Sequence, residues 1–471
     1  MTINTIATTK KRKDMKFNEV NESYTMAEAI QEAQRCLHCK VPQCKKACPI
    51  SNEIPDWIHE LKKGNLGNAI SIIRTKSNLP AVCGRVCAHE RQCEGSCVLG
   101  KKGQHINIGK LERFIADFDA ENHLTHEDMA EKSRGKVAVI GSGPAGITVA
   151  GDLSRMGFAV EMFEMEHQCG GVLRYGIPEY RLPKEVVARE IRHIESMGVT
   201  IHRDTTVGVE TTIDKMFEQG FDAIFIGTGT GKPKSLSIPV KTMTGSDKQI
   251  NSEDLRGVRL ATHFLRRMEL YNEGFISHDE VSVRPGHRVM VIGCGNTAMD
   301  AARTAIRIGA ERVDVVYHRG IENMAALKAE YDDAIKEGAY FNWHSSITEI
   351  HIDDQENIKE VVIETKEKGE DGEEKVTRRT EPADRIIMAV GATPNTRIVR
   401  TTSGLENDEK KFLITRDIPY GMTTRKGVFA GGDVANRQAT VVHAMQDAKR
   451  VAEGIAQYVD AVKLMNAIEG Q

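Results

Sequence analysis

The sequence has no long apolar run and no excess of charge of either sign. Its uninterrupted apolar stretches stay well short of the roughly 20 residues that a membrane-spanning helix needs, and the polar start MTINTIATTKKRKD lacks the apolar segment of a secretory signal. Lys and Arg number 64 against 67 Asp and Glu, which leaves a net charge of −3. Binding to nucleic acid or to an anionic membrane through bulk charge needs a clear basic excess. The sequence therefore predicts a cytoplasmic protein with no nucleic-acid and no membrane partner.

Aromatic residues are also scarce, at 5% of 471 residues, while apolar residues in total make up 40%. That balance is ordinary for an α/β protein with a sizeable core. At about 150 residues per domain, the length predicts about three domains. The stretch from residue 24 to residue 119 is rich in helix formers, and Thr25 with Glu28 is a candidate capping box at its start. We expect a small helical domain over residues 1–130.

Cysteine is unevenly distributed, because eight of the ten cysteines lie between Cys36 and Cys97. A cytosolic chain keeps its thiols reduced, so thiols at short spacing more often bind metal than form disulfides. Zinc sites usually contain two C-x2-C pairs, but only one is present here, and a run of four cysteines that ends in Cys-Pro is typical of iron–sulfur proteins. Iron–sulfur clusters are therefore favoured over zinc. The candidate ligands are Cys36, Cys39, Cys44, Cys48, Cys87, Cys93 and Cys97.

A glycine-rich turn follows the apolar strand expected at residues 137–140. Gly141 permits a tight turn, Gly143 lets the backbone approach a pyrophosphate, and Gly146 allows close packing of the next helix on the strand. The N-terminus of that helix offers N–H groups to the phosphates. Glu164 stands at the end of the next strand, where a carboxylate accepts hydrogen bonds from a ribose. The residues predicted to bind this first dinucleotide are Gly141, Gly143, Pro144, Ala145, Gly146 and Glu164.

A second unit of strand, glycine-rich turn and helix begins near His287. At the end of its second strand, the stretch VVYHR carries His318 and Arg319 where an NAD-binding protein has a carboxylate. A guanidinium pairs with the 2′-phosphate of NADPH through two hydrogen bonds, whereas a carboxylate would repel it. NADPH is therefore favoured over NADH. The residues predicted for this site are Gly293, Gly295, Asn296, Thr297, Ala298, His318 and Arg319.

The last hundred residues contain two strand-like stretches, ADRIIMAVG and GVFAGGDVA, and then a helix from about Thr440. Asp433 suits a ribityl or phosphate hydroxyl, and the positive end of the helix dipole would stabilise the negative charge of a reduced flavin. Glu164 and Asp433 would then flank one flavin although they lie far apart in sequence. The candidate residues of this part are Gly391, Gly432, Asp433, Thr440 and Val441.

These units predict a discontinuous domain organisation. Residues 131–250 and 385–471 would form the FAD-binding domain, and residues 251–384 would form an NADPH-binding domain inserted into it. The expected fold class is α/β, with a helical iron–sulfur N-terminal domain followed by two nested Rossmann-like dinucleotide-binding domains of the glutathione-reductase type. The charged stretch Lys366–Glu374 is predicted to be an exposed hairpin.

Several motifs together resemble one known family. They are RCLHCKVPQCKKACPI, LPAVCGRVC with QCEGSCVLG, INIGKLERFIAD, VAVIGSGPAGITVAGDL, GGVLRYGIPEYRLP, VIGCGNTAMDAARTA and GVFAGGDVA. In this combination they resemble the small (β) subunit of NADPH-dependent glutamate synthase. Its relatives include the large subunit of the bifurcating NADH-dependent ferredoxin:NADP oxidoreductase and the N-terminal half of dihydropyrimidine dehydrogenase. The resemblance extends over nearly the whole chain from about residue 17.

The resemblance implies FAD, NADPH and two [4Fe–4S] clusters as cofactors. It implies that one cluster is bound by Cys36, Cys39 and Cys44 with Glu112 as the fourth ligand. The ligands implied for the other cluster are Cys48, Cys87, Cys93 and Cys97. The residues implied to lie beside the flavin are Gly171, Val172 and Ile177.

The function that the resemblance implies is electron input. Hydride would pass from NADPH to FAD, and single electrons would pass through the clusters to a partner, in first place the large subunit of glutamate synthase in glutamate biosynthesis. No catalytic acid–base residues are predicted, because hydride transfer depends on positioning. Two alternatives stay open: the large subunit of a bifurcating ferredoxin:NADP transhydrogenase, and a non-catalytic NADPH-binding scaffold that holds zinc. The chain could also form a homo-oligomer.

Overall fold

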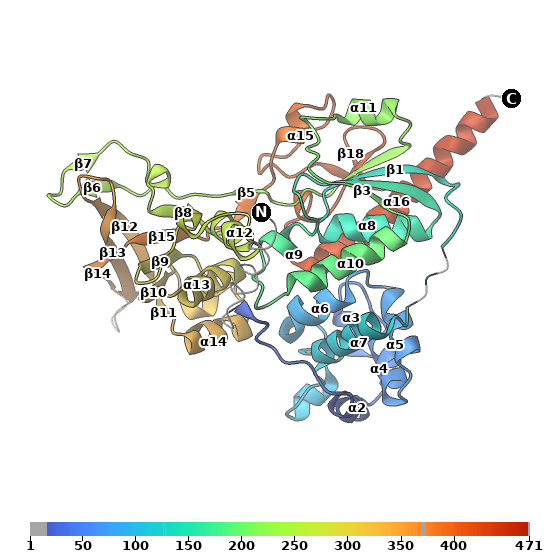
Figure 1. Ribbon diagram of the computed structural model, residues 1–471, viewed down its shortest axis with the longest axis horizontal. Coiled ribbons are helices and arrows are strands. Elements are labelled where there is room, and N and C mark those ends of the chain that lie inside the picture. The colour runs from blue at the N-terminus through green and yellow to red at the C-terminus, as the bar shows by residue number, and fades with distance from the viewer. Residues whose placement is uncertain (1–16, 126, 128, 369–372, 470–471) are drawn as a thin grey trace, which may run out of the picture. The chain divides into compact units, whose positions relative to one another are not determined.

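The computed structural model describes residues 17–125, 127, 129–368 and 373–469 (Figure 1). The chain folds as two compact units. Of the described residues, the larger unit contains Glu19–Arg174, Arg181–Lys232 and those from Thr393 onward, and the smaller unit contains Pro233–Ala392 with Tyr175–Tyr180, Phe17 and Asn18. Among the described residues, no helix is both long enough and apolar enough to cross a membrane. The polar start of the chain, up to residue 16, lies outside the described residues.

The first part of the larger unit is helical, as predicted. Its helices are α2 (Met26–Gln34), α3 (Gln43–Ala47), α4 (Ile54–Lys62), α5 (Leu66–Arg74), α6 (Pro80–Val86) and α7 (Ile108–Asn122), with the 3-10 helices η2 (His89–Arg91) and η3 (Val98–Lys102) in the cysteine loops. The capping box is confirmed, because the Glu28 N–H donates to Thr25 Oγ1 at 3.3 Å and the Thr25 N–H donates to Glu28 Oε2 at 2.7 Å. Trp57, Leu61 and Ile70 are fully buried and form the core of this part.

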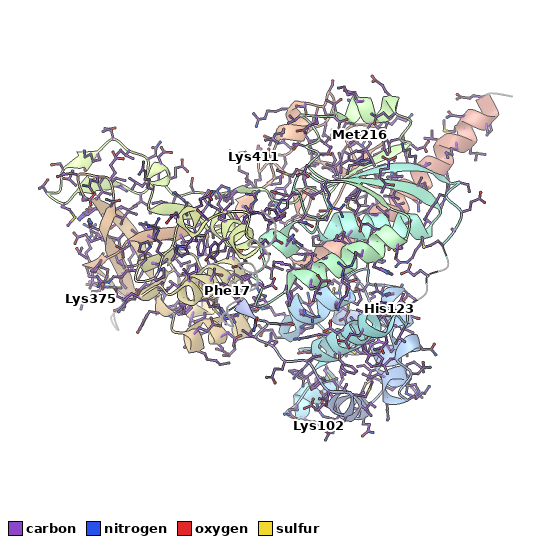
Figure 2. The ribbon with its side chains drawn as sticks, viewed as in Figure 1. Phe17, Lys102, His123, Met216, Lys375 and Lys411 are labelled. Atoms are coloured by element: carbon purple, nitrogen blue, oxygen red, sulfur yellow. The ribbon has the colours of Figure 1, made fainter. Side chains whose placement is uncertain are left out.

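The rest of the larger unit is built on a seven-stranded sheet in the order β17-β18-β19-β4-β1-β2-β3. Its parallel strands are β1 (Gly135–Ile140), β2 (Phe158–Phe163), β3 (Thr200–His202), β4 (Ala223–Ile226) and β19 (Val428–Ala430), and its antiparallel edge strands are β18 (Tyr420–Thr423) and β17 (Thr415–Asp417). Its helices are α8 (Pro144–Arg155), α9 (Val172–Tyr175), α10 (Lys184–Ser196), α11 (Ile213–Glu218), α15 (Arg397–Arg400), the 3-10 helix η7 (Gly432–Val434) and α16 (Val441–Glu469). Helices α8, α10 and α16 lie on the face of the sheet toward the N-terminal helices (Figure 1). On the other side, Met216 of α11 is buried in the core (Figure 2).

The smaller unit contains two five-stranded sheets. The parallel sheet has the order β11-β10-β9-β15-β8, with β8 (Val258–Leu260), β9 (Arg288–Ile292), β10 (Arg312–Val316), β11 (Tyr340–Asn342) and β15 (Arg385–Met388). The other has the order β14-β13-β12-β6-β7, with β6 (Val240–Thr242), β7 (Asp247–Lys248), β12 (Ser345–Ile352), β13 (Ile358–Lys368) and β14 (Glu374–Pro382). The helices are η4 (Ser252–Asp254), α12 (Ala261–Asn272), η5 (His278–Glu280), α13 (Asn296–Ile308), η6 (Ile321–Asn323) and α14 (Lys328–Glu337). The antiparallel pairing of β13 with β14 confirms the strands of the predicted hairpin, whose turn at 369–372 lies outside the described residues.

The smaller unit is an insertion in the larger one. The chain leaves the larger unit after β4 and returns to it before β19, which pairs with β4. The strands that lead into and out of the insertion, β5 (Lys232–Pro233) and β16 (Ala392–Thr393), pair with each other. The insertion spans Pro233–Ala392, which is longer than the expected 251–384, because β6 pairs with β12 of the smaller unit's second sheet.

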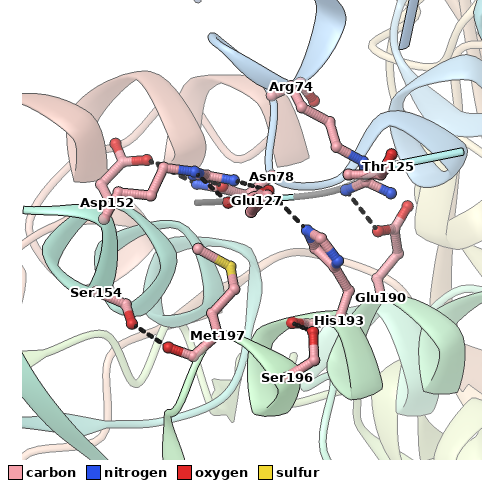
Figure 3. A network of polar contacts seen from close by, with 12 residues as sticks. Arg74, Asn78, Thr125, Glu127, Asp152, Ser154, Glu190, His193, Ser196 and Met197 are labelled. Atoms are coloured by element: carbon pink, nitrogen blue, oxygen red, sulfur yellow. Dashed lines mark hydrogen bonds and ion pairs between the residues drawn. The ribbon is translucent and has the colours of Figure 1, made fainter. Parts of the chain in front are cut away.

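A polar network inside the larger unit joins the N-terminal helices to the sheet (Figure 3). Asn78, just before α6, donates a hydrogen bond to the Asp152 carboxylate of α8 at 2.9 Å. Glu127, between α7 and β1, pairs with Arg155 of α8 at 2.6 Å and with His193 of α10 at 2.9 Å. The N-terminal helices, expected as a domain of their own over residues 1–130, are therefore packed with the sheet in one unit.

Glu127 makes this network sensitive to acid. Burial alone would raise its pKa, but hydrogen bonds from His193 and Arg155 outweigh burial and hold the pKa at about 2, below the ordinary 4.5. A carboxyl whose pKa is lowered by folding stabilises the fold above its unfolded-state pKa, and this contribution is lost as the pH falls through the folded-state value.

We therefore expect Glu127→Gln to lower the free energy of unfolding at pH 7 by about 1–2 kcal/mol. The difference from the natural chain should shrink as the pH falls from 4.5 toward 2, the span between the two pKa values of Glu127. Urea unfolding at a series of pH values measures it, with Glu185→Gln as the control because Glu185 is exposed in its pair with Arg192. A difference that stays constant with pH would contradict the assignment.

Candidate functional site

The first glycine-rich turn lies where the sequence predicts it, between β1 and α8. Gly141 has a φ of +96°, and a Cβ on Gly146 would lie 1.9 Å from the carbonyl oxygen of Gly141. Both positions therefore require glycine. A Cβ on Gly143, the N-cap of α8, would meet no atom within 4 Å. The open space beside Gly143, together with the first helical residues Pro144 and Ala145, fits an approaching pyrophosphate.

Glu164 stands at the carboxyl end of β2, next to this turn, and is 5% exposed. Its Oε2 accepts hydrogen bonds from the Ser142 N–H at 2.9 Å and from the Ser142 hydroxyl at 2.5 Å. Its Oε1 accepts one from the Glu166 N–H at 2.9 Å. A carboxylate oxygen can accept two hydrogen bonds, so Oε1 has room for a second donor. This geometry fits the predicted bond to a ribose hydroxyl.

The loop after β19 meets the same turn. Gly432 has a φ of +72°, and a Cβ on it would lie 2.8 Å from the Cβ of Ala145 in α8. The Gly432 N–H donates to Asp447 Oδ2 at 2.7 Å. Burial, with a smaller contribution from the charge of Asp447, raises the pKa of Asp433 to about 6. Around pH 6 Asp433 can therefore both donate and accept a hydrogen bond, which suits a bound hydroxyl.

The N-terminus of α16 lies against this loop. A Cβ on Gly432 would be 3.5 Å from the Cβ of Ala444, in the first turn of α16. Thr440 caps that turn, because its Oγ1 accepts a hydrogen bond from the His443 N–H at 3.4 Å. The structure therefore brings Glu164, the first glycine-rich turn and the start of α16 at Val441 together in the larger unit.

The other predicted flavin residues fall in both units. Gly171 lies beside the first turn, because a Cβ on it would be 3.0 Å from Gly143 Cα, and the adjacent Val172 is 53% exposed. Ile177 and Gly391 belong to the smaller unit. Gly391 has a φ of +94°, and its carbonyl accepts a hydrogen bond from the Lys234 N–H at 2.9 Å. Their contact with a flavin stays a prediction.

The second glycine-rich turn, between β9 and α13 of the smaller unit, repeats the geometry of the first. Gly293 has a φ of +122°, and a Cβ on it would lie 2.3 Å from the carbonyl oxygen of Ala389. A Cβ on Gly295, the N-cap of α13, would meet no atom within 4 Å. Ala298 is fully buried against the turn. The start of α13 therefore offers the same open approach for a pyrophosphate.

The remaining predicted residues of this site surround the turn or follow the next strand. Asn296 Oδ1 accepts a hydrogen bond from the Leu327 N–H at 2.9 Å, and Thr297 is exposed. His318 and Arg319 are both exposed and follow β10 after one intervening residue, Tyr317. The end of the second strand of such a unit is where the adenosine ribose binds. The placement of Arg319 is therefore compatible with a 2′-phosphate.

Four thiols line one pocket among the N-terminal helices. Cys36, Cys39, Cys44 and Cys97 share it with apolar side chains such as Ile54, and it encloses about 400 Å³, part of which is open to solvent. Burial raises the pKa of the Cys44 thiol to about 11 and also raises that of Cys36. A buried thiolate needs a positive partner, which a metal centre supplies. These four cysteines are named the outer site.

A second group lies deeper, with Cys93 7% and Glu112 8% exposed. Burial raises the pKa of Cys48 and Cys93, and the charge of Glu112 raises both further. The pKa of Cys87 is raised by a hydrogen bond with Cys83, by burial and by the same carboxylate. Burial, and then the charge of Glu190, raise the pKa of Glu112 to about 8. Glu112 therefore acts on three thiols, and the group Cys48, Cys87, Cys93 and Glu112 is named the inner site.

Two of the expected ligands are exchanged between the sites. The resemblance assigned Glu112 to the cluster of Cys36, and it assigned Cys97 to the cluster of Cys48. In the structure Cys97 instead lines the outer pocket, and Glu112 acts on Cys48. The chain turns tightly before Cys97, since a Cβ on Gly95 would lie 2.0 Å from a backbone oxygen. In addition, α7, which carries Glu112, packs against α6, which ends just before Cys87. The packing of the loops and helices therefore favours a division of the ligands that differs from the expected one.

The outer site fits an iron–sulfur cage. The ligands of a cubane bind separate iron atoms and so surround a volume, whereas zinc draws its four ligands to one point. Four thiols surround this pocket, and Ile54, Ile58 and Ile106 line it with them. In the described part of the chain, no group of three or more His, Cys, Asp or Glu side chains is arranged to hold a single metal ion. Four thiolate donors around an apolar-lined cavity fit a [4Fe–4S] cluster.

Cys83 is a residue of this region that sequence spacing did not single out. It is 2% exposed on α6, and its Sγ lies 3.6 Å from the Sδ of Met445 in α16. The sequence signal that could have found it is its position four residues before Cys87, the spacing at which side chains become neighbours in a helix.

Comparisons with known proteins match both parts of the chain. Residues 12–124 match the family model for dihydropyrimidine dehydrogenase domain II, 4Fe-4S cluster, and residues 135–448 match the model for pyridine nucleotide-disulphide oxidoreductase. The thioredoxin reductase of Lactococcus lactis has a similar fold, with a TM-score of 0.50 and 24% identity over 69% of this chain and 99% of that one. The predicted fold class is therefore confirmed. The chain is an NAD(P)-dependent flavin oxidoreductase with a helical 4Fe–4S domain.

Curated relatives align with nearly the whole chain. The glutamate synthase [NADPH] small chain of Halomonas elongata is 35% identical over 94% of this chain and 93% of its own length, and that of Escherichia coli K12 is 32% identical over 96% and 95%. The NADP(+)-dependent formate dehydrogenase subunit beta of Moorella thermoacetica is 33% identical over 88% of this chain and 60% of its own length. The chain belongs to the family of the glutamate synthase small chain.

Proposed function

We propose that the chain is the NADPH-oxidising, electron-input subunit of a glutamate synthase. FAD supplies the conversion of a hydride from NADPH into single electrons, and two [4Fe–4S] clusters carry them onward. The observation that carries this proposal is the packing of α6 against α16. Helix α6 ends just before the inner-site residue Cys87, and the first turn of α16 lies at the Gly432 loop. The flavin-binding and cysteine sites thereby share one compact unit.

Each cysteine site would hold one cluster. The outer set is Cys36, Cys39, Cys44 and Cys97, and the inner set is Cys48, Cys87, Cys93 and Glu112. We favour Glu112 over Cys83 as the fourth ligand, because the charge of Glu112 raises the pKa of Cys48, Cys87 and Cys93, whereas Cys83 raises only that of Cys48 and Cys87 and its Sγ contacts Met445 Sδ at 3.6 Å. A carboxylate ligand gives the inner cluster a potential different from that of an all-thiolate cluster.

The burial of the two sites supports an order of electron flow. The inner site adjoins α16 through Cys83 and Met445. The outer site opens to solvent, and its loop exposes Leu37 at 61% and Val41 at 58%. Electrons would therefore enter at the inner site and leave at the outer site, where a partner subunit can approach.

Arg319 supports the choice of NADPH. We expect Arg319→Ala to raise KM for NADPH by roughly 10- to 100-fold, the value of a charge-assisted hydrogen bond pair, with kcat and the KM for NADH unchanged. Steady-state dye reduction with each nucleotide measures this. Lys336→Ala is the control, because Lys336 is an exposed cation of the same unit. Equal losses with NADPH and NADH would show that Arg319 does not bind the 2′-phosphate.

The relatives named as glutamate synthase small chains support the choice of partner. The test uses the chain purified without oxygen. We expect about eight iron atoms per chain, bound flavin, and bleaching of a dye on addition of NADPH. Glutamate should form from glutamine and 2-oxoglutarate only after a glutamate synthase large chain is added. Zinc in place of iron, or no NADPH oxidation, would refute the proposal, and transfer of electrons to ferredoxin but not to the large chain would favour the transhydrogenase instead.

A further inference from the structure

The segments that form the outer site are basic, although the chain as a whole carries a net charge of −3. The residues that line the outer pocket all lie within three segments, 36–63, 97–102 and 106–108. Together these segments contain seven lysines and three carboxylates, so their net charge is +4. Positive charge is therefore concentrated at the one cysteine site that opens to solvent.

The three carboxylates of these segments already have basic partners nearby. The pairs are Glu53 with Lys45 at 2.6 Å, Glu60 with Lys63 at 2.8 Å and Asp56 with His38 at 3.0 Å. The five other lysines are exposed, and none of them forms an ion pair with another residue that the structure describes. They are Lys40, Lys46, Lys62, Lys101 and Lys102. The chain itself therefore leaves these five charges without a counterion.

Four elements of the outer site carry the five lysines. Lys40 and Lys46 follow a cysteine of the pocket by one and two residues, in the cysteine loop and in α3. Lys62 ends α4, whose earlier turns line the pocket. Lys101 and Lys102 end η3, whose first residues also line it. Lys102 lies at the end of the N-terminal helices that faces away from the sheet (Figure 2).

Two large apolar side chains are exposed among these charges. Leu37 is 61% exposed and Val41 is 58% exposed, and they lie in the loop on either side of Cys39. An apolar centre inside a polar rim is the usual anatomy of a protein–protein interface. Nucleic acid and anionic lipid are bound through phosphate charge and would leave this apolar centre without a purpose. The combination therefore favours a protein partner.

We propose that Leu37, Val41 and the five lysines form a docking surface, named the outer-site face, for an acidic face of the electron-accepting subunit. This inference rests on the proposed function, because it states how the partner of that function is recognised. The lysines would raise the rate of encounter and orient the partner, since complementary charge acts mainly on association. Leu37 and Val41 would exclude water from the centre of the contact, directly above the pocket that holds the outer thiols.

Charge reversal at the edge of the outer-site face tests the electrostatic part. Lys62→Glu combined with Lys102→Glu is suitable because neither residue lies within four positions of an outer-site cysteine. With the glutamate synthase large chain at limiting concentration and low salt, we expect glutamate formation to slow about 10- to 100-fold. In the natural chain the rate should fall as salt is added, and in the variant this fall should disappear. Iron and flavin contents show that each variant is loaded.

Two further variants complete the design. Lys215→Glu combined with Lys411→Glu is the matched control, because both are exposed lysines of the larger unit outside the N-terminal helices, and Lys411 is labelled in Figure 2. It should keep the natural rate. Val41→Ser tests the apolar centre, and we expect it to weaken binding of the large chain about 5- to 10-fold while the salt dependence stays that of the natural chain.

Two small electron acceptors of opposite charge give a readout that does not need the large chain. After reduction by NADPH, the Lys62→Glu and Lys102→Glu variant should reduce ferricyanide, an anion, more slowly than the natural chain does at low salt. It should reduce the cation hexaamminecobalt(III) faster. Both differences should vanish at high salt, where charges on the surface are screened.

The natural rate with the large chain in the Lys62→Glu and Lys102→Glu variant, or an equal loss in the control, would overturn the inference. Binding to a short DNA duplex or to phosphatidylserine vesicles that is tighter than binding to the large chain, and that is lost in the same variant, would overturn it as well. A natural chain that contains no iron, or that forms no glutamate with the large chain, would instead refute the proposed function. The two failures can therefore be told apart.

Discussion

Replacing Cys97 by alanine is expected to empty the outer site and spare the inner one, which leaves about half of the iron. Cys97 lines the outer pocket with Cys36, Cys39 and Cys44, and a cage that loses one thiolate ligand is released or degraded. Electron transfer to the large chain should fall to background because the exit site is gone. Reduction of the bound flavin by NADPH should continue. Iron analysis and the visible spectrum of the variant measure the effect.

Paired variants show which ligands share a cluster. Cys36→Ala combined with Cys97→Ala should lose no more iron than either change alone, because both act on one site. Cys48→Ala combined with Cys97→Ala should lose all of it, because the two act on different sites. If the Cys36→Ala and Cys97→Ala pair lost all the iron and the Cys48→Ala and Cys97→Ala pair lost only half, the division expected from the sequence would be correct. Cys294→Ala, at a buried cysteine of the smaller unit, controls for general loss of a thiol and should keep all its iron.

Gly146→Ala is expected to be the most destabilising addition of a single methyl group in the first dinucleotide turn. The new Cβ would lie 1.9 Å from the carbonyl oxygen of Gly141, a backbone atom that cannot turn away as a side chain would, and 3.4 Å from the Val139 side chain. Overpacking of this kind costs about 3 kcal/mol, and α8 would separate from β1. We expect a lower unfolding temperature and little soluble protein.

Gly143→Ala is the matched variant, because a Cβ there would meet no atom within 4 Å and its φ of −72° suits alanine. It should unfold at the temperature of the natural chain when both are free of flavin. Its methyl group would nevertheless occupy the space proposed for the pyrophosphate, so bound FAD should be lost. Thermal unfolding and flavin fluorescence measure the pair. An unchanged unfolding temperature in Gly146→Ala would argue against the tight turn. A Gly143→Ala variant that binds as much FAD as the natural chain would argue against a pyrophosphate site beside Gly143.

The features that the sequence predicts well are those carried by contiguous residues. The strand, the glycine-rich turn and the helix at Gly141–Gly146 form a local pattern, and the carboxylate of Glu164 follows one strand later at the same edge. The Thr25 capping box is equally local. In each case the backbone conformation and the side-chain type are fixed by neighbours within one supersecondary unit, so spacing is sufficient evidence.

The features that the sequence does not reveal depend on packing between distant segments. Whether Cys97 joins Cys36 or Cys48 depends on the turn at Gly95 and on how α7 packs against α6. The contact of Cys83 with Met445 joins residues 362 positions apart. The start of the insertion at Pro233 follows from the pairing of β6 with β12, which spacing between motifs cannot show.

The pairing of β4 with β19 has a consequence for how the protein is made. On the ribosome, the cysteine loops and the first half of the flavin-binding sheet emerge early, but β4 must wait with an open edge until the whole inserted unit has been synthesised. The insertion is continuous and can fold first, since domains generally fold as units. The side of α6 that carries Cys83 stays uncovered until α16 arrives. The contact between Cys83 and Met445 can therefore form only after the last helix has been synthesised and has docked.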